Sequence, residues 1–200
     1  MNRTALGCAV AGVIAVVLAL LLWVPYNRLV GMEENVGAQW AQVESQYQRR
    51  ADLIPNLVST VQGAAGFEQD TLLAVTEARS KATQLNVGGG VPTAEELAEF
   101  DATQGELTQA LSRLLVVVEA YPQLTATQNF RDLQAQLEGT ENRIAVERQR
   151  YNEVALSYET TRRRFPTVLI AGLLGFDEIA YFSAQPGAET APPVDFSNAG

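Results

Sequence analysis

Residues 130–164, FRDLQAQLEGTENRIAVERQRYNEVALSYETTRRR, decide the fold class of this chain. Large side chains recur in this stretch at alternating spacings of three and four, at Phe130, Leu133, Leu137, Ile144, Tyr151, Val154 and Tyr158, and Thr140 and Glu147 occupy the two remaining places. This period marks one face of an α-helix, and the pattern lasts for about thirty residues. Such a helix packs against others with the small left-handed crossing angle of a coiled coil. The sequence therefore predicts an all-α bundle of long helices.

Three further stretches have the helical period, which gives about four long helices in all. The first carries apolar or aromatic residues at spacings of three, four or seven and ends at Gly63 and Gly66; these residues are Val36, Trp40, Val43, Tyr47, Ile54, Leu57 and Val61. A second helix is expected over about residues 67–85. A third is expected to begin at the capping box Thr93-Ala94-Glu95-Glu96 and to end near Ala120, before Tyr121-Pro122.

Two positions in the first helical stretch leave alternatives open. Pro55 lacks a backbone N–H, so it should kink a continuous helix near residues 51–53, or else open a new helix. Asn27 either caps the helix or lies inside one that is continuous with the residues before it.

The N-terminal residues predict a single-pass membrane anchor over residues 1–26. Residues 5–24, ALGCAVAGVIAVVLALLLWV, carry no charge and would span about 30 Å as a helix, the thickness of the hydrocarbon core of a bilayer. A cleaved signal peptide has a shorter apolar run and small residues before its cleavage site, so an uncleaved anchor is favoured. Cys8 precedes most of the run, whereas a lipoprotein cysteine follows it, so Cys8 is interpreted as part of the helix wall. Arg3 and the amino terminus precede the run and Arg28 follows it, which weakly favours a bundle outside the cell.

Composition excludes several classes of function. The 200 residues include no histidine and one cysteine, which rules out mechanisms that need an imidazole, histidine-based metal sites and an intrachain disulfide. What remains for catalysis is carboxylates, hydroxyls and Lys81, so no enzyme activity and no cofactor are expected. The formal net charge of −9 disfavours binding to the phosphates of nucleic acids.

The C-terminal part differs from the helical stretches. Residues 165–182 contain the apolar run PTVLIAGLLGF, which is too short to span a bilayer. Burial against the bundle is the first interpretation, and docking on the membrane or on another subunit is the alternative. Residues 183–200 are rich in Ala, Pro, Gly and Ser and are expected to be a disordered tail. The bundle would therefore occupy residues 27–182.

Several stretches, in the same order along the chain, resemble the LemA family. They are RRADLIPNLV at 49–58, EAYP at 119–122, EGTENRIA at 138–145, YN at 151–152, FP at 165–166 and GLLGF at 172–176. The resemblance implies an N-terminal transmembrane helix and an antiparallel bundle of long helices in a bacterial plasma (inner) membrane protein. The molecular function of the family is uncertain, and its relatives include magnetosome membrane proteins. An extracytoplasmic N-terminus has been proposed for the family, which would place the bundle in the cytoplasm, opposite to the side that the charges favour.

Two clusters of polar residues interrupt the apolar stripes within these stretches. The first cluster is Arg49, Arg50, Asp52 and Asn56, and the second is Glu138, Glu141, Asn142 and Arg143. The leading interpretation is that they form charged and hydrogen-bonded pairs between helices and fix the helix register. A surface that recognises a partner or a second copy is the second. A carboxylate metal or catalytic site built on Glu138 and Glu141 is the third, because Glu-x-x-Glu is common on solvated helices.

Three functions are consistent with these features. The leading hypothesis is a membrane-anchored, non-enzymatic scaffold that assembles with itself or with other membrane proteins, with a role in membrane organisation as a special case. An adaptor or receptor that binds a small ligand or peptide in the bundle core is the second, with a pocket lined by residues such as Thr140 and Glu147. An enzyme would need two carboxylates with shifted pKa values in a cleft.

Overall fold

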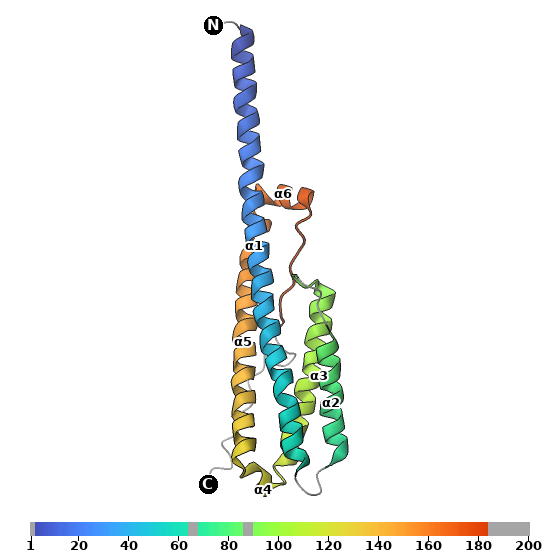
Figure 1. Ribbon diagram of the computed structural model, residues 1–200. Coiled ribbons are helices and arrows are strands. Elements are labelled where there is room, and N and C mark those ends of the chain that lie inside the picture. The colour runs from blue at the N-terminus through green and yellow to red at the C-terminus, as the bar shows by residue number, and fades with distance from the viewer. Residues whose placement is uncertain (1–2, 64–67, 86–89, 184–200) are drawn as a thin grey trace, which may run out of the picture.

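The computed structural model describes residues 3–63, 68–85 and 90–183; between residues 3 and 21 it describes the helix but gives the exposure of only Gly12, Val13 and Val16. Within these ranges the protein contains helices and no strands (Figure 1). The helices are α1 Arg3–Gln62, α2 Gln69–Gln84, α3 Ala94–Val118, α4 Pro122–Thr125, α5 Gln128–Arg162 and α6 Thr167–Leu174. The all-α class and the four long helices are confirmed. The predicted tail lies outside the described residues, apart from Ser183.

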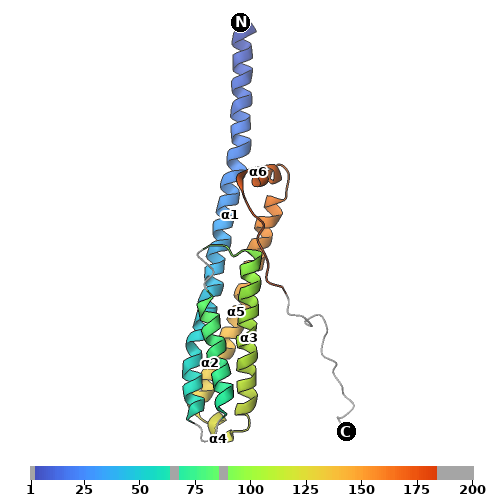
Figure 2. The same cartoon turned by 90° about the vertical axis from the view of Figure 1, so that its right-hand side faces the viewer.

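The long helices pack antiparallel in two pairs. α1 and α5 form the longer pair, and α2 and α3 form a shorter pair beside it (Figures 1 and 2). The one-turn helix α4, which the sequence did not predict, joins α3 to α5 at one end of the bundle, and α6 lies across α1 and α5 at the other end. The N-terminal part of α1 extends beyond the bundle, and Leu29 is its first buried residue among those described.

α1 is one continuous helix, which resolves the two alternatives at Asn27 and Pro55. Both residues lie inside it, so Asn27 is not a cap and Pro55 does not open a new helix. Pro55 cannot donate a hydrogen bond to the carbonyl of Ala51. Arg79 on α2 supplies the missing donor, because its Nε lies 2.7 Å from the Ala51 carbonyl oxygen. A side chain from the neighbouring helix thus compensates for the proline inside α1.

The capping box at the start of α3 is confirmed. The Thr93 Oγ1 accepts a hydrogen bond from the Glu96 amide at 3.2 Å, and a Glu96 carboxylate oxygen accepts one from the Thr93 amide at 2.8 Å. These hydrogen bonds favour the ionised carboxylate and lower the pKa of Glu96. The cap fixes where α3 begins after the preceding loop.

The predicted stripe on α5 faces the interior. Six of its nine residues are buried and the other three are partly buried. Beyond Tyr151, three residues outside the predicted stripe, Ala155, Glu159 and Thr161, are buried as well. The buried face of α5 is wider there because residues 176–183, which we call the return segment, cover it.

Residues 165–183 divide into α6 and the return segment. Gly175, with φ of +76°, ends α6 in the left-handed conformation that glycine adopts without strain. The return segment then runs back along the bundle and buries Phe176, Ile179 and Phe182 (Figure 2). On α6, by contrast, several large apolar side chains are exposed. Burial against the bundle is therefore correct for the return segment and for only one side of α6.

The buried residues form two apolar clusters along the bundle. One cluster lies toward α6 and includes Trp40, Tyr47, Phe100 and Ile144 together with the return segment. The other lies toward α4 and is centred on residues of all four long helices; it includes Ile54, Leu57, Leu72, Val75, Leu107, Leu114 and Leu137. Among the described residues, no helix has an apolar stretch long enough to cross a membrane.

Candidate functional site

Arg50 is the centre of a polar layer between the two apolar clusters. This residue lies in the middle of α1 and is almost completely buried, with 1% of its whole surface, backbone included, exposed. The Nη1 atom lies 3.0 Å from the Thr108 Oγ1 on α3 and 3.0 Å from a Glu141 carboxylate oxygen on α5. The Nη2 atom donates to the side-chain and backbone oxygens of Gln104. One arginine thus joins three helices.

Thr140 and Tyr47 complete the surroundings of this layer. Thr140 on α5 is fully buried, and its hydroxyl donates to the carbonyl of Gln136 at 2.8 Å, so it needs no partner from another helix. The Arg50 guanidinium also lies over the Tyr47 ring, 4.9 Å from its centroid. Such a cation–π contact attracts the guanidinium to the aromatic ring, in addition to its attraction to the Glu141 carboxylate.

The structure brings together only two of the eight polar residues that the sequence singled out. Arg50 and Glu141 form an ion pair, whereas the other six are exposed. Of the exposed residues, Asp52 accepts a hydrogen bond from Gln48 and Glu138 accepts one from Gln134, each within its own helix. The other four are Arg49, Asn56, Asn142 and Arg143. The geometry of Arg50 and Glu141 agrees with the register interpretation, and the remaining residues form part of the solvent-exposed surface.

A groove of about 850 Å³ lies beside the polar layer, between α1, α3, α5 and the return segment. Arg50, Asp101, Glu141, Arg148 and Tyr181 are among the residues that line it. Thr140 and Glu147, which the sequence suggested as pocket residues, do not line it. Glu147 is instead held by Gln39 at 2.7 Å and by Arg150 at 2.7 Å.

Arg148 closes the groove toward the return segment. It forms an ion pair with Asp101 on α3 at 2.8 Å and donates to the Tyr47 hydroxyl at 3.3 Å. Its guanidinium also lies 4.3 Å from the centroid of the Phe182 ring. Burial of the Tyr47 phenol raises its pKa, and the nearby arginines oppose that rise. Arg148 therefore connects α3, α1 and the return segment on one side of the groove.

Side chains of α5 bind the backbone of the return segment. Asn152 accepts from the Phe182 amide at 2.9 Å and donates to the Phe182 carbonyl at 3.0 Å. A Glu159 carboxylate oxygen accepts from the Ile179 amide at 2.9 Å. The hydroxyls of Tyr151 and Tyr158 donate to the carbonyls of residues 180 and 177 at 3.2 and 3.0 Å. Side chains of α5 thus supply hydrogen bonds to the backbone N–H and C=O groups of the return segment, which pairs with no strand.

Sequence reasoning missed the roles of these α5 residues. Tyr151 and Tyr158 were expected on the apolar stripe, which is correct, but their hydroxyls bind backbone. Glu159 lies outside the stripe and is buried against Arg162, with a 2.9 Å ion pair. The sequence did contain a signal for these roles. Asn152 and Glu159 lie seven residues apart on one side of the long helix, and an apolar segment able to fold back over them follows it.

The arrangement holds its charged groups in pairs. Glu141 is bound by Arg50, Glu159 by Arg162 and Asp101 by Arg148. Within the described part of the chain, no group of three acidic or cysteine side chains is placed so that it could hold a metal ion. The chemistry that this site supports best is hydrogen-bonded joining of helices.

Comparison with known proteins identifies the family of the chain. The sequence profile of the LemA family matches residues 39–196 of the chain. The chain belongs to the LemA family. The resemblance seen in the sequence is therefore confirmed.

Curated relatives include magnetosome proteins. The chain is 28% identical to magnetosome protein MamQ 2 of Paramagnetospirillum magneticum over 199 residues, which cover 91% of this chain and 72% of the relative. It is 26% identical to MamQ of Magnetospirillum gryphiswaldense, with coverage of 92% and 74%. It is also 23% identical to protein LemA of Metamycoplasma hominis, with coverage of 80% and 69%. None of these names is that of an enzyme.

The stretches that resemble the LemA family supply the contacts described above. Residues 49–58 contain Arg50 and Pro55, and residues 138–145 contain Glu141. Residues 151–152 bind the return segment, and residues 172–176 form the end of α6 and the turn into that segment. In this LemA-family protein, Arg50 and Glu141 within these stretches join helices, and Tyr151 and Asn152 bind the return segment.

Proposed function

We propose that the protein is a membrane-anchored, non-enzymatic scaffold whose bundle assembles with copies of itself or with other membrane proteins. The observation that carries this proposal is the continuity of α1. One helix of 60 residues contains both the apolar run 5–24 and the core residues from Leu29 onward. At 1.5 Å per residue it is about 90 Å long, so residues 5–24 can span a bilayer while the rest forms the bundle.

The end of the apolar run supports a membrane anchor. Trp23, Val24 and Tyr26 are exposed on α1, a few residues before Leu29, the first buried residue among those described. Exposed tryptophan and tyrosine at the end of an apolar helix are typical of membrane interfaces. The relatives named as magnetosome proteins also agree with a role at a membrane. We place the protein in the plasma (inner) membrane of a bacterium as a single-pass protein.

Exposed apolar side chains on the bundle provide surfaces for assembly. Val146 and Leu156 are exposed on α5, as are Leu73 on α2 and Val116 on α3. Each surface is small, and an isolated contact of this kind would be weak in solution. Anchoring in a membrane raises the effective concentration of such surfaces, which allows weak contacts to assemble.

The absence of enzyme activity belongs to the same proposal. The two carboxylates that line the groove, Asp101 and Glu141, are both bound by arginines, so neither is free to act as a general acid or base there. We therefore assign the polar layer a structural role and expect no cofactor and no nucleic-acid partner.

A labelling and crosslinking experiment tests the scaffold. Single cysteines replace the exposed Ser59 and Ser157 in a Cys8→Ser background, and intact cells are treated with a membrane-impermeant maleimide before crosslinking. Labelling of intact cells puts the bundle outside, and labelling only after lysis puts it in the cytoplasm. On either side, a ladder of crosslinked multiples or adducts supports the scaffold, and a monomer band alone in native membranes contradicts it.

The groove supports a second candidate function, an adaptor that binds a peptide. Its volume of about 850 Å³ lies in the range of ligand sites, and it is lined by charged, polar and aromatic side chains. The return segment shows that this part of the bundle binds extended backbone. Protection of the Ala98→Cys side chain from maleimide by a bound peptide would favour the adaptor over the scaffold.

A further inference from the structure

We propose that α6 is an interfacial helix that lies in the headgroup layer of the bilayer that residues 5–24 cross. This inference rests on the proposed membrane anchor and extends it, because it adds a second contact with lipid and fixes how the bundle is oriented. The bundle would stand with its α6 end against the membrane and its α4 end away from it.

The two sides of α6 differ in exposure. Thr167, Ile170 and Ala171 are buried against α1 and α5. On the other side, Leu169 is 66% exposed and Leu173 79%, and Phe165, two residues before α6, is 82% exposed. Residues 165–176 contain no charged side chain. Large apolar side chains grouped on one side of a short helix mark a contact surface, and an uncharged helix suits lipid.

The position of α6 selects the bilayer as the occupant. α6 lies across the direction of α1, at the level where α1 leaves the bundle (Figures 1 and 2). The Tyr26 ring contacts the Phe176 ring edge to face, with 5.7 Å between their centroids, which ties the end of α6 to the end of the apolar run. If residues 5–24 cross the membrane, a helix that lies across them at this level lies in the membrane plane.

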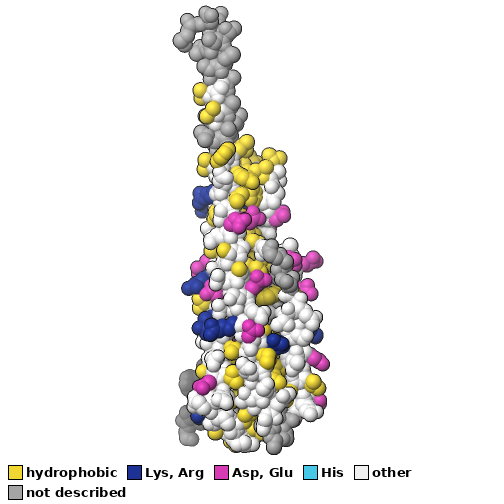
Figure 3. Space-filling view, in the orientation of Figure 1, with side chains coloured by type: hydrophobic (Ala, Val, Ile, Leu, Met, Phe, Trp, Pro, Cys, Tyr) yellow, Lys and Arg dark blue, Asp and Glu magenta, His cyan; other side chains and the backbone are white. Residues whose placement is uncertain are grey.

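The exposed side chains near α6 form one continuous apolar surface with those of α1. Figure 3 shows hydrophobic side chains gathered at the end of the bundle from which the N-terminal part of α1 emerges. The exposed large apolar residues of α1 include Leu22, Trp23 and Val24, and those of α6 include Leu169 and Leu173. A protein partner would have to surround α1 to cover this surface, whereas a bilayer covers it without further contacts.

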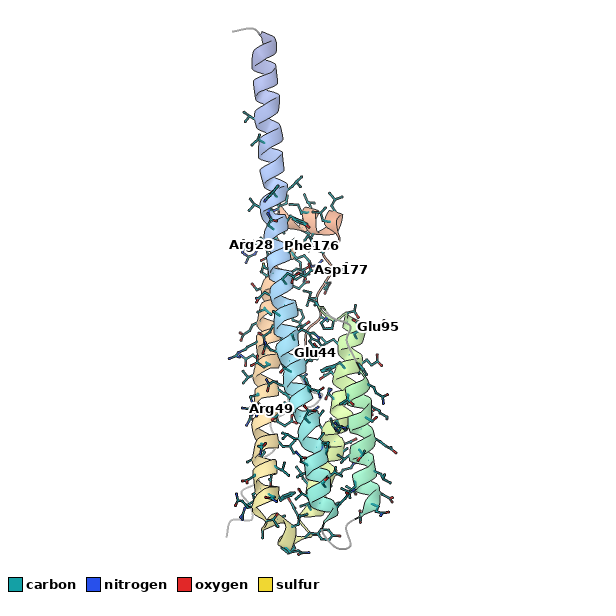
Figure 4. The ribbon with its side chains drawn as sticks, viewed as in Figure 1. Arg28, Glu44, Arg49, Glu95, Phe176 and Asp177 are labelled. Carbon is teal, nitrogen blue, oxygen red and sulfur yellow. The ribbon has the colours of Figure 1, made fainter. Side chains whose placement is uncertain are left out.

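Charges near α6 are ordered as at a membrane surface. Arg163 and Arg164 are exposed at the end of α5, just before α6, and Arg28 is exposed on α1. In Figure 4, Arg28 lies at the level of Phe176, and Asp177 lies on the bundle side of Phe176. Arginines at this level can contact anionic headgroups, which attract basic residues near the membrane surface.

Depth-dependent quenching tests the proposal on the full chain. The Cys8→Ala protein is reconstituted into vesicles of phosphatidylethanolamine and phosphatidylglycerol, and an environment-sensitive fluorophore is attached at one of three exposed positions. Leu173→Cys reports on α6, Val16→Cys on the anchor, and Val116→Cys is the matched control at the other end of the bundle. Spin-labelled lipids carry the quencher in the headgroup or at the centre of the acyl chains. Circular dichroism verifies that each variant keeps its helix content.

We expect the probe at Leu173→Cys to be quenched best by the headgroup label, because an interfacial helix inserts about 5–10 Å below the surface. The probe at Val16→Cys should be quenched by the acyl-chain label, and the probe at Val116→Cys by neither.

The other outcomes separate this inference from the proposed anchor. Quenching at Val16→Cys without quenching at Leu173→Cys would overturn the inference and leave the anchor standing. A blue-shifted but unquenched probe at Leu173→Cys would mean that a second copy covers α6, and would also overturn it. Quenching at Leu173→Cys alone would support the interfacial helix and contradict the anchor. No quenching at either position would overturn both.

Discussion

The Arg50 guanidinium lies 3.0 Å from a Glu141 carboxylate oxygen, and this pair joins the middle of α1 to the middle of α5. The Arg50 side chain is 2% exposed and that of Glu141 43% exposed, so solvent screens the anion much more than the cation. Apolar clusters lie on both sides of the pair. If α5 moved by one turn along α1, Arg50 would lose Glu141 and keep only its partners on α3, Thr108 and Gln104. This geometry agrees with a role of the pair in fixing the register of α1 against α5.

Replacing Arg50 should destabilise the bundle strongly. Arg50→Ala removes hydrogen bonds to two other helices and leaves a cavity, so we expect the free energy of unfolding to fall by about 2–4 kcal/mol. Arg49→Ala is the matched control, because Arg49 is exposed and should change stability by less than about 0.5 kcal/mol. Chemical denaturation monitored by circular dichroism measures both values. Equal effects of the two substitutions would contradict the structural role of Arg50.

Arg79 and Pro55 should be energetically coupled. Arg79→Ala leaves the Ala51 carbonyl without a hydrogen-bond donor, which should lower the free energy of unfolding by about 1–2 kcal/mol. In a Pro55→Ala background the backbone N–H at position 55 can donate to that carbonyl, so the cost of Arg79→Ala should be smaller. A double-mutant cycle measures the difference. Lys81→Ala, an exposed substitution on the same helix, should show no coupling to Pro55→Ala.

Asn152 should control the mobility of the return segment. Asn152→Ala removes both hydrogen bonds to the backbone of Phe182, so the amide of Phe182 should exchange with solvent faster. Amides of α2 and α3 should remain protected from exchange, because the two hydrogen bonds that are lost join Asn152 to Phe182 and not to these helices. Hydrogen exchange followed by mass spectrometry measures this. Asn142→Ala, an exposed substitution on α5, is the control, and faster exchange of the return segment in that variant would argue against a specific role of Asn152.

The bundle should lose stability at high pH partly through Tyr158. Burial and nearby carboxylates raise the pKa of Tyr158 from 10.0 to about 12. In the unfolded chain the phenol ionises near pH 10, whereas in the folded chain it stays protonated. The contribution of Tyr158 to the free energy of unfolding is therefore fully present below about pH 10 and is lost as the pH rises toward 12. Denaturation at several pH values should show a steeper alkaline decline for the wild type than for Tyr158→Phe. Equal declines would mean that Tyr158 does not titrate as the structure indicates.

Much of the bundle could be predicted from the sequence because helical periodicity is a local signal. The stripe on α5 and the capping box at Thr93 each depend on residues a few positions apart, and both were correct. The effect of Pro55 was harder to predict. Whether a proline ends a helix depends on a donor such as Arg79, which is distant in sequence and close in space.

The candidate site could be predicted only in part for the same reason. Arg50 and Glu141 were singled out among eight polar residues, but nothing in the sequence distinguished them from Arg49 and Glu138, which are exposed. Burial of Arg50 depends on the rotation of three helices about their axes. The role of Asn152 depends on the return of residues 176–183, and irregular backbone has no periodic signal.

The most direct test of this account is whether residues 5–24 insert the full chain into a bilayer. The chain is synthesised in the presence of vesicles of phosphatidylethanolamine and phosphatidylglycerol, washed with alkaline carbonate and floated on a density gradient. Val13→Arg combined with Val16→Arg places two charges near the centre of the apolar run, at a cost of about 2.5–3.5 kcal/mol each. Val116→Arg combined with Val146→Arg adds the same charge to exposed positions on the bundle.

We predict that the wild type and the Val116/Val146 control float with the vesicles after the wash, and that the Val13/Val16 variant stays in the soluble fraction with its helix content intact. A wild-type chain that is removed from the vesicles by the wash would contradict the membrane anchor on which the account depends.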